Sequence, residues 1–199
     1  MHNPLEDPDV LLIQGFIDSK DPQNFNRLMD RYQDRVYNFC YRFLGNESDA
    51  ADCSQEILIK VFKSLDRFEF RAKFSSWLYR ISLNTCNEMV RSKEYRHRKN
   101  RVESEILNKE HHLYKNADVS KNFDPEVSLY RKQINEAFQN ALDKMKTVHK
   151  TIIILRDIEG YSYEEIAKIT GMKIGTVRST LARARYKMAG QLKEFRNAM

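Results

Sequence analysis

Arginine and small polar residues gather near the carboxyl end of the chain, within GYSYEEIAKITGMKIGTVRSTLARARY at residues 160–186. A helix that begins near Ile174 would bury one apolar face and leave small and basic residues on the other. That free face would carry Gly175, Thr176, Arg178, Ser179, Ala182, Arg183 and Tyr186. Small residues let a helix enter a major groove, and arginines contact phosphates or guanine edges. The pattern favours DNA binding over an ordinary helical hairpin with a basic surface.

Capping residues predict how this helix is positioned. Ser162 and Glu165 form a capping-box pattern that would start a short helix, and Gly171 can end it in a left-handed conformation. The two helices together make a helix–turn–helix. The core side of the second helix would carry Val177, Leu181, Ala184 and Met188. Two amphipathic helices, within 134–145 and 148–158, precede this unit.

A second group of residues, at 66–74, interleaves aromatic rings with cations. Its members are Arg67, Phe68, Phe70, Arg71, Lys73 and Phe74. Bases stack on rings while phosphates meet charges, so this composition suits single-stranded nucleic acid. The helix that follows adds Trp77 and a polar set, Arg80, Asn84, Asn87 and Arg91. In the alternative interpretation the three phenylalanines fill the core beneath a loop.

Acidic residues mark one face of a helix predicted over 48–65. Asp49, Asp52 and Glu56 recur at three- and four-residue spacing, with Gln55 beside them. Either they form a solvated first turn favoured by the helix dipole, or they form a charged docking face for a protein. A metal–carboxylate site is less supported, because no second helix offers matching acids. The apolar face is predicted to carry Ala51, Ser54, Leu58, Val61, Phe62 and Leu65.

Composition sets the fold class. The 199 residues include only six glycines and four prolines, which favours an all-α protein of two small helical domains joined by a flexible linker. One long helix is expected from Asp21 to Gly45. A net charge of +6 suits polyanion partners. The three cysteines are far apart and in no CxxC pair, so no metal site is predicted. The amino terminus is unlike a signal peptide, and no apolar run is long enough for a bilayer span.

Three segments together resemble one protein family. DAADCSQEILIKVF, then FSSWLYRISLN, then YSYEEIAKITGMKIGTVRSTLARAR resemble, in order and separation, the extracytoplasmic-function (ECF) sigma factors of bacterial RNA polymerase. The resemblance implies region two at 21–95, a linker at 96–127 and region four, with the helix–turn–helix, at 128–192. It implies binding without catalysis and no cofactor.

The resemblance also assigns residues. Core-polymerase docking, on the clamp of the largest subunit, falls to Asp49, Asp52, Gln55 and Glu56. Recognition and melting of the −10 element falls to Phe68, Phe70, Arg71, Lys73, Phe74, Trp77, Arg80, Asn84, Asn87 and Arg91. Recognition of the −35 element falls to Lys173, Gly175, Thr176, Arg178, Ser179 and Arg183. Arg183 and Arg185 match an RAR pattern in which one arginine is structural.

Several residues depart from the family pattern. Met145-Lys146 stands where Leu-Pro is usual, and Thr180 stands where arginine is usual, so a DNA contact is expected to be missing there. Lys173 occupies an expected N-cap position where serine is common. The implied partners are core polymerase, promoter DNA and an anti-sigma factor, in the cytoplasm and with no direct membrane insertion.

Two other classes of protein remain as alternatives. A stand-alone helix–turn–helix regulator would bind its operator tightly without polymerase, usually as a dimer on a two-fold site. A nucleic-acid enzyme would need clustered acids, a metal constellation or a nucleophile with arginine partners, and no convincing set is found.

Overall fold

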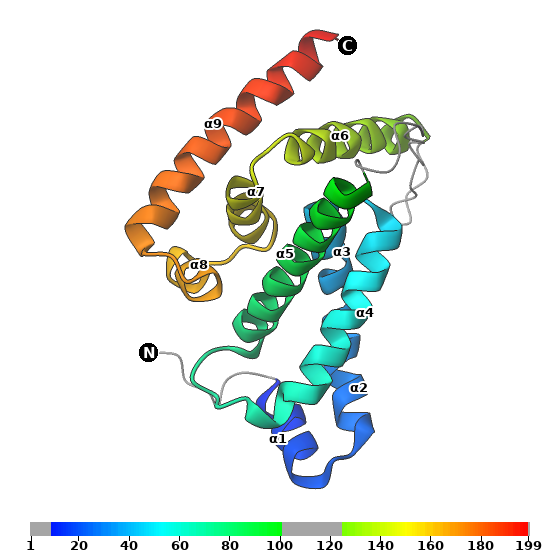
Figure 1. The fold of residues 1–199 in the computed structure, drawn as a ribbon, viewed down its shortest axis with the longest axis vertical. Coiled ribbons are helices and arrows are strands. Elements are labelled where there is room, and N and C mark those ends of the chain that lie inside the picture. The colour runs from blue at the N-terminus through cyan, green and yellow to red at the C-terminus, as the bar shows by residue number, and fades with distance from the viewer. Residues whose placement is uncertain (1–8, 101–124, 199) are drawn as a thin grey trace.

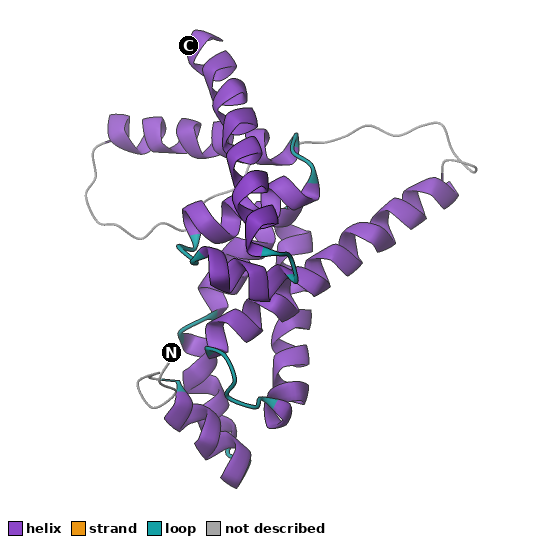
Figure 2. Cartoon of the chain, turned by 90° about the vertical axis from the view of Figure 1, so that its left-hand side faces the viewer, coloured by secondary structure: helices purple, strands orange, loops and turns teal. Residues whose placement is uncertain are grey.

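The computed structural model describes residues 9–100 and 125–198, and every regular element within those ranges is a helix (Figures 1 and 2). The all-α fold class is therefore confirmed. The first module contains α1 (Val10–Ser19), α2 (Pro22–Asp30), α3 (Gln33–Leu44), α4 (Glu47–Ser64), the short η2 (Leu65–Arg67) and α5 (Phe74–Asn100). The second contains α6 (Pro125–Asp143), α7 (Thr147–Ile153), η3 (Ile154–Ile158), α8 (Tyr163–Thr170) and α9 (Ile174–Ala198).

The core of the first module lies between α3, α4 and α5, where Phe39 meets Tyr79 edge to face at 5.2 Å. Helix α4 buries Ala50, Cys53, Ile57 and Val61, and Leu65 of η2 is also buried. The predicted apolar face of this helix was therefore rotated by one residue for most positions, and Phe62 is 46% exposed. Adjacent residues are both apolar or small along much of α4, so periodicity alone did not settle which set faces the neighbouring helices.

The expected single helix from Asp21 to Gly45 is wrong, because two helices occupy that stretch. Helix α2 ends at Asp30 and α3 begins at Gln33. At the break, the Arg31 guanidinium lies 2.8 Å from an Asp9 carboxylate oxygen, and the Tyr32 hydroxyl donates to the other oxygen. A tertiary contact with the segment before α1 therefore accompanies an interruption that the local sequence did not signal.

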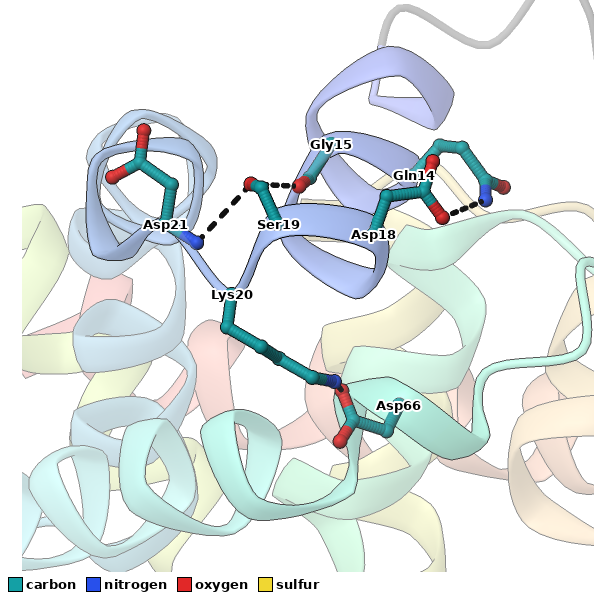
Figure 3. Close-up of polar contacts among 7 residues, drawn as sticks. All are labelled: Gln14, Gly15, Asp18, Ser19, Lys20, Asp21 and Asp66. Carbon is teal, nitrogen blue, oxygen red and sulfur yellow. Dashed lines mark hydrogen bonds and ion pairs between the residues drawn. The ribbon is translucent and has the colours of Figure 1, made fainter.

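Helix α1 was not predicted from the sequence. It packs beside α2 and buries Ile13 and Phe16. Figure 3 shows the corner after it, where the Ser19 hydroxyl donates to the Gly15 carbonyl at 2.6 Å and Lys20 reaches Asp66 of η2 at 2.5 Å. The contact between Lys20 and Asp66 joins the end of α1 to η2, which follows α4.

The second module follows its predicted local structure closely. Ser162 and Glu165 form the capping box, with bonds of 3.1 Å and 2.9 Å to each other's backbone N–H groups. Gly171 ends α8 at φ +73°, in the left-handed conformation that glycine adopts without strain. Helix α9 then begins at Ile174, and Val177, Leu181, Ala184 and Met188 are buried.

The two modules pack against each other, with α8 touching α5 and with α6 and α7 touching α3 (Figure 1). Glu159, between η3 and α8, accepts from the Tyr79 hydroxyl at 2.5 Å and from Arg35 at 3.1 Å. The Lys73 ammonium lies 3.1 Å from Glu165 of the capping box. The modules therefore share polar contacts that neither could make alone.

A second set of contacts joins the end of α3 to α6 and α7. The Lys150 ammonium donates to the Phe43 carbonyl at 3.1 Å, and Gln139 donates to the Arg42 carbonyl at 3.3 Å. These donors satisfy carbonyls that a helix carboxyl end leaves unpaired. Gly45 allows the approach, because a Cβ at that position would lie 2.8 Å from the Asp143 carboxylate.

Candidate nucleic-acid interface

The amino-terminal half of α9 presents the small and basic face that the sequence predicted. Val177, Leu181 and Ala184 are buried, and the residues between them, apart from Thr180, are exposed. The exposed residues of this face are Lys173, Gly175, Thr176, Arg178, Ser179, Ala182, Arg183 and Tyr186. A bare glycine and short hydroxyl side chains at the start of a helix permit close approach of a duplex.

Contacts with neighbours distinguish the arginines of α9. The Arg178 guanidinium lies 5.6 Å from the centre of the Tyr163 ring, so α8 restrains a side chain that stays exposed. Arg185 instead makes two bonds to the Asp157 carboxylate, one of them 3.1 Å long. Both arginines of the RAR pattern are exposed, but Arg185 is paired with an acid, whereas Arg183 lies on the small and basic face.

Thr180 is only 8% exposed, so it faces the interior of the module and not the outer face of α9. The sequence interpretation treated this position as the site of a missing DNA contact. An arginine there would have to extend from a buried position to reach a duplex, so its absence changes the outer face less than expected.

Polar residues of α5 also share one face. Arg80, Asn84 and Arg91 are exposed and Asn87 is half-buried. They recur at intervals of three and four residues, which places them along one side of the helix. This surface carries two guanidinium and two amide groups that can bond to phosphates and base edges.

The aromatic segment before α5 is largely buried. Phe68 and Phe74 are 7% and 1% exposed, and their rings meet at 5.9 Å, with Trp77 packed 5.4 Å from Phe68. Phe70 is the half-buried member and has φ +56°, a left-handed conformation that costs a bulky residue free energy. Arg71 beside it is exposed. The structure thus leaves Phe70 as the phenylalanine of this set most accessible to a base.

One face of α4 combines acids with an exposed apolar side chain. Asp52, Gln55 and Glu56 are exposed, and Asp49 is half-buried with its N–H bonded to the Asn46 side chain at 3.0 Å. Ile59 follows at the same helical spacing and is 54% exposed. Sequence reasoning missed Ile59, although an apolar residue one turn after Gln55 and Glu56 was the available signal. Acids beside an exposed isoleucine are typical of a protein-docking surface.

The three cysteines meet in the core of the first module. Cys53 Sγ lies 3.6 Å from Cys86 Sγ, which lies 3.8 Å from Cys40 Sγ. Bonds among the thiols and burial raise the pKa values of Cys40 and Cys86. Hydrogen bonds from the same two thiols lower the pKa of Cys53. Buried cysteines of this kind are common in protein cores. No fourth ligand joins the cluster within the described ranges. The spacing in sequence gave no hint of this proximity, because each cysteine comes from a different helix.

None of the described helices is long and apolar enough to cross a bilayer.

Family models match both modules. The model for Sigma-70 region 2 matches residues 28–96, and that for Sigma-70 region 4 matches residues 135–188. Among similar proteins, the ECF RNA polymerase sigma factor SigW of Bacillus subtilis is 30% identical over 174 residues, which cover 87% of this chain and 91% of that protein. SigE of Mycolicibacterium smegmatis is 34% identical over 169 residues, which cover 85% of this chain and 62% of SigE. The ECF sigma-E factor of Escherichia coli K12 is 30% identical over 178 residues, which cover 89% and 90%.

Solved structures share the fold. The sigma factor RpoE of Bartonella quintana, in complex with the anti-sigma factor NepR, superposes with a TM-score of 0.66 at 24% identity, covering 86% of this chain and 98% of that one. CnrH, in complex with the cytosolic domain of CnrY, gives the same TM-score at 22% identity, covering 94% and 99%.

Proposed function

Because this chain belongs to the extracytoplasmic-function (ECF) family of RNA polymerase sigma factors, we propose that it binds core polymerase and directs it to promoters with −35 and −10 elements. The activity is binding and not catalysis. The observation that carries the proposal is the outward face of α9, where Thr176, Arg178 and Ser179 are exposed while Val177 and Leu181 are buried. That face belongs to a helix–turn–helix whose first helix, α8, begins with the Ser162–Glu165 capping box.

Each module has its own proposed role. Residues 21–95 dock on the polymerase clamp through Asp49, Asp52, Gln55 and Glu56, and Ile59 extends that face. The α5 face binds the −10 element, and Phe70 with Arg71 holds an opened base. Residues 128–192 read the −35 element, and residues 96–127 link the two. One well-stacked base contributes about 1–3 kcal/mol, enough to offset much of the cost of flipping one base.

The packed arrangement has a consequence for promoter binding. The centres of −35 and −10 elements lie about 25 base pairs apart, or about 85 Å along a duplex at about 3.4 Å per base pair. Helices α5 and α8 touch, and Lys73 is paired with Glu165. We infer that the packed modules do not span this distance on one duplex. We infer that polymerase separates them, so the free chain binds promoters poorly.

The same proposal includes a restraining partner. RpoE of Bartonella quintana was solved with an anti-sigma factor, and its fold matches this one. By analogy, an anti-sigma protein would hold this chain inactive in the cytoplasm, in some conditions at the inner membrane, and would release it under stress.

Co-elution with core polymerase tests the docking face. Ile59→Asp should weaken the complex by tenfold or more, because it places an unpaired charge at an apolar contact; tenfold corresponds to about 1.4 kcal/mol. Leu11→Asp is the matched control, since Leu11 of α1 is 82% exposed and lies outside the proposed face. Equal binding by both variants would overturn the proposed face. Failure of the unaltered chain to co-elute would overturn the function itself and favour a stand-alone regulator.

A further inference from the structure

A groove between α7 and α9 has a composition that the assignments above leave unexplained. Its volume is about 550 Å³, and its lining consists of Lys146, His149, Ala182, Arg183, Tyr186 and Lys187. Lys146 stands where the family resemblance expects proline, so one of the three full cations of this groove comes from a departure in this chain. No acid is among the residues that line it.

His149 forms the buried part of the groove. It is 9% exposed, and its Nδ1 atom has no hydrogen-bond partner among the described residues. Burial, together with the charges of Lys187, Lys146 and Arg183, lowers the pKa of its imidazole. Three cations therefore converge on a buried ring with an unused polar atom, which is an arrangement that an anion would stabilise.

The groove is continuous with the outer face of α9. Ser179, Arg183 and Lys187 recur every four residues, so they lie along one side of the helix at intervals of about 6 Å. Arg183 belongs both to the proposed −35 face and to the groove. A duplex placed on Thr176 and Ser179 would continue past Arg183 toward Lys187, and its sugar–phosphate backbone presents a negative charge at every nucleotide.

We propose that this groove binds a backbone phosphate of the duplex whose bases α9 reads. Lys146, just before α7, and Lys187 of α9 hold the phosphate, Arg183 lies between the groove and the base-reading face, and His149 forms the floor. The inference rests on the proposed function of region four and extends it, because it adds Lys146, His149 and Lys187 to the DNA-binding surface. Such a contact fixes the position of α9 on the duplex and carries no sequence preference.

Salt dependence of DNA binding tests the groove without knowledge of the promoter. The full chain is titrated onto a mixed-sequence duplex at several salt concentrations. Replacing Lys146→Gln together with Lys187→Gln should lower the slope of log K against log salt by about 1, the value for one lost phosphate contact. The matched control, Lys144→Gln with Lys193→Gln, removes the same charge from exposed positions outside the groove and should leave the slope nearer that of the unaltered chain.

A second readout follows the imidazole signals of His149 by nuclear magnetic resonance. Duplex DNA should shift these signals in the unaltered chain and not in the doubly substituted one. If inorganic phosphate shifts them while DNA does not, the groove binds a small anion and the DNA assignment is overturned. An equal slope in the groove variant and the unaltered chain also overturns it.

DNA-binding measurements on a further variant distinguish an error in the groove assignment from an error in the proposed function. Arg178→Ala, outside the groove, should weaken DNA binding whether or not the groove takes part. Loss with Arg178→Ala but none with the groove variant overturns the groove alone. If neither Arg178→Ala nor the groove variant weakens DNA binding, the proposal that α9 binds DNA is refuted.

Discussion

Substitution of Glu159 is the most specific way to weaken the contact between the two modules. Its side chain is 8% exposed and accepts from the Tyr79 hydroxyl at 2.5 Å and from Arg35 at 3.1 Å. Burial, and then the charge of Glu159, raises the pKa of Tyr79, so this hydroxyl stays protonated and remains a donor. Glu159→Gln keeps the size of the side chain and one acceptor oxygen, and removes the charge.

The expected magnitude follows from these contacts. A hydrogen bond to a charged group contributes about 1.5–3 kcal/mol and a neutral one about 0.5–1.5 kcal/mol, so Glu159→Gln should cost the packed arrangement about 1–2 kcal/mol. That change corresponds to a rise of about 5- to 30-fold in the ratio of open to packed molecules. The backbone contacts from Lys150 and Gln139 to the end of α3 remain, so the packed state persists as a population.

Single-molecule fluorescence energy transfer measures that ratio. Dyes are attached through Lys63→Cys in the first module and Lys168→Cys in the second, both at exposed positions, and the native cysteines are buried from the reagent. Glu159→Gln should increase the low-transfer population, whereas the exposed neighbour Glu164→Gln should not. Equal ratios for Glu159→Gln and the unaltered chain, or an equal change with Glu164→Gln, would refute the reasoning.

Three further outcomes are expected. Ser162→Ala removes the cap of α8 and should lower the free energy of unfolding by about 1 kcal/mol in thermal melts; an unchanged melting temperature would contradict the role of the capping box. Because burial lowers the pKa of His149 in the folded chain, its contribution to stability is present above the unfolded pKa of about 6.5 and is lost as the pH falls below it. Urea unfolding at about pH 7.5 and pH 5.5 should show a smaller difference for His149→Gln than for the unaltered chain. Arg183→Ala should reduce the salt slope of DNA binding, whereas Arg185→Ala should leave it nearly unchanged and cost about 0–1 kcal/mol of stability.

Local signals in the sequence predicted the helix–turn–helix well. The Ser162–Glu165 box, the left-handed Gly171 and the apolar spacing of α9 all depend on residues within a few positions of one another. Each therefore specifies a backbone conformation or a buried face without help from distant parts of the chain. One of the three segments that carry the family resemblance is this helix–turn–helix.

Features that need distant residues were not predictable in this way. The break between α2 and α3 is accompanied by contacts with the distant Asp9, and the three cysteine thiols meet only through the packing of α3, α4 and α5. The bond between Glu159 and Tyr79 joins residues 80 positions apart. The groove between α7 and α9 likewise combines Lys146 with Lys187. Tertiary packing brings these groups together, and hydrophobic periodicity carries no information about which polar residues will meet.

Run-off transcription is the most direct test of the central claim that this chain gives core polymerase its promoter specificity. Core polymerase with and without the purified chain transcribes fragmented DNA from the bacterium that encodes it, and the 5′ ends of the transcripts are sequenced. The account predicts discrete new start sites that share two upstream elements, and loss of those sites with Ile59→Asp. Transcripts identical to those of core polymerase alone would contradict it.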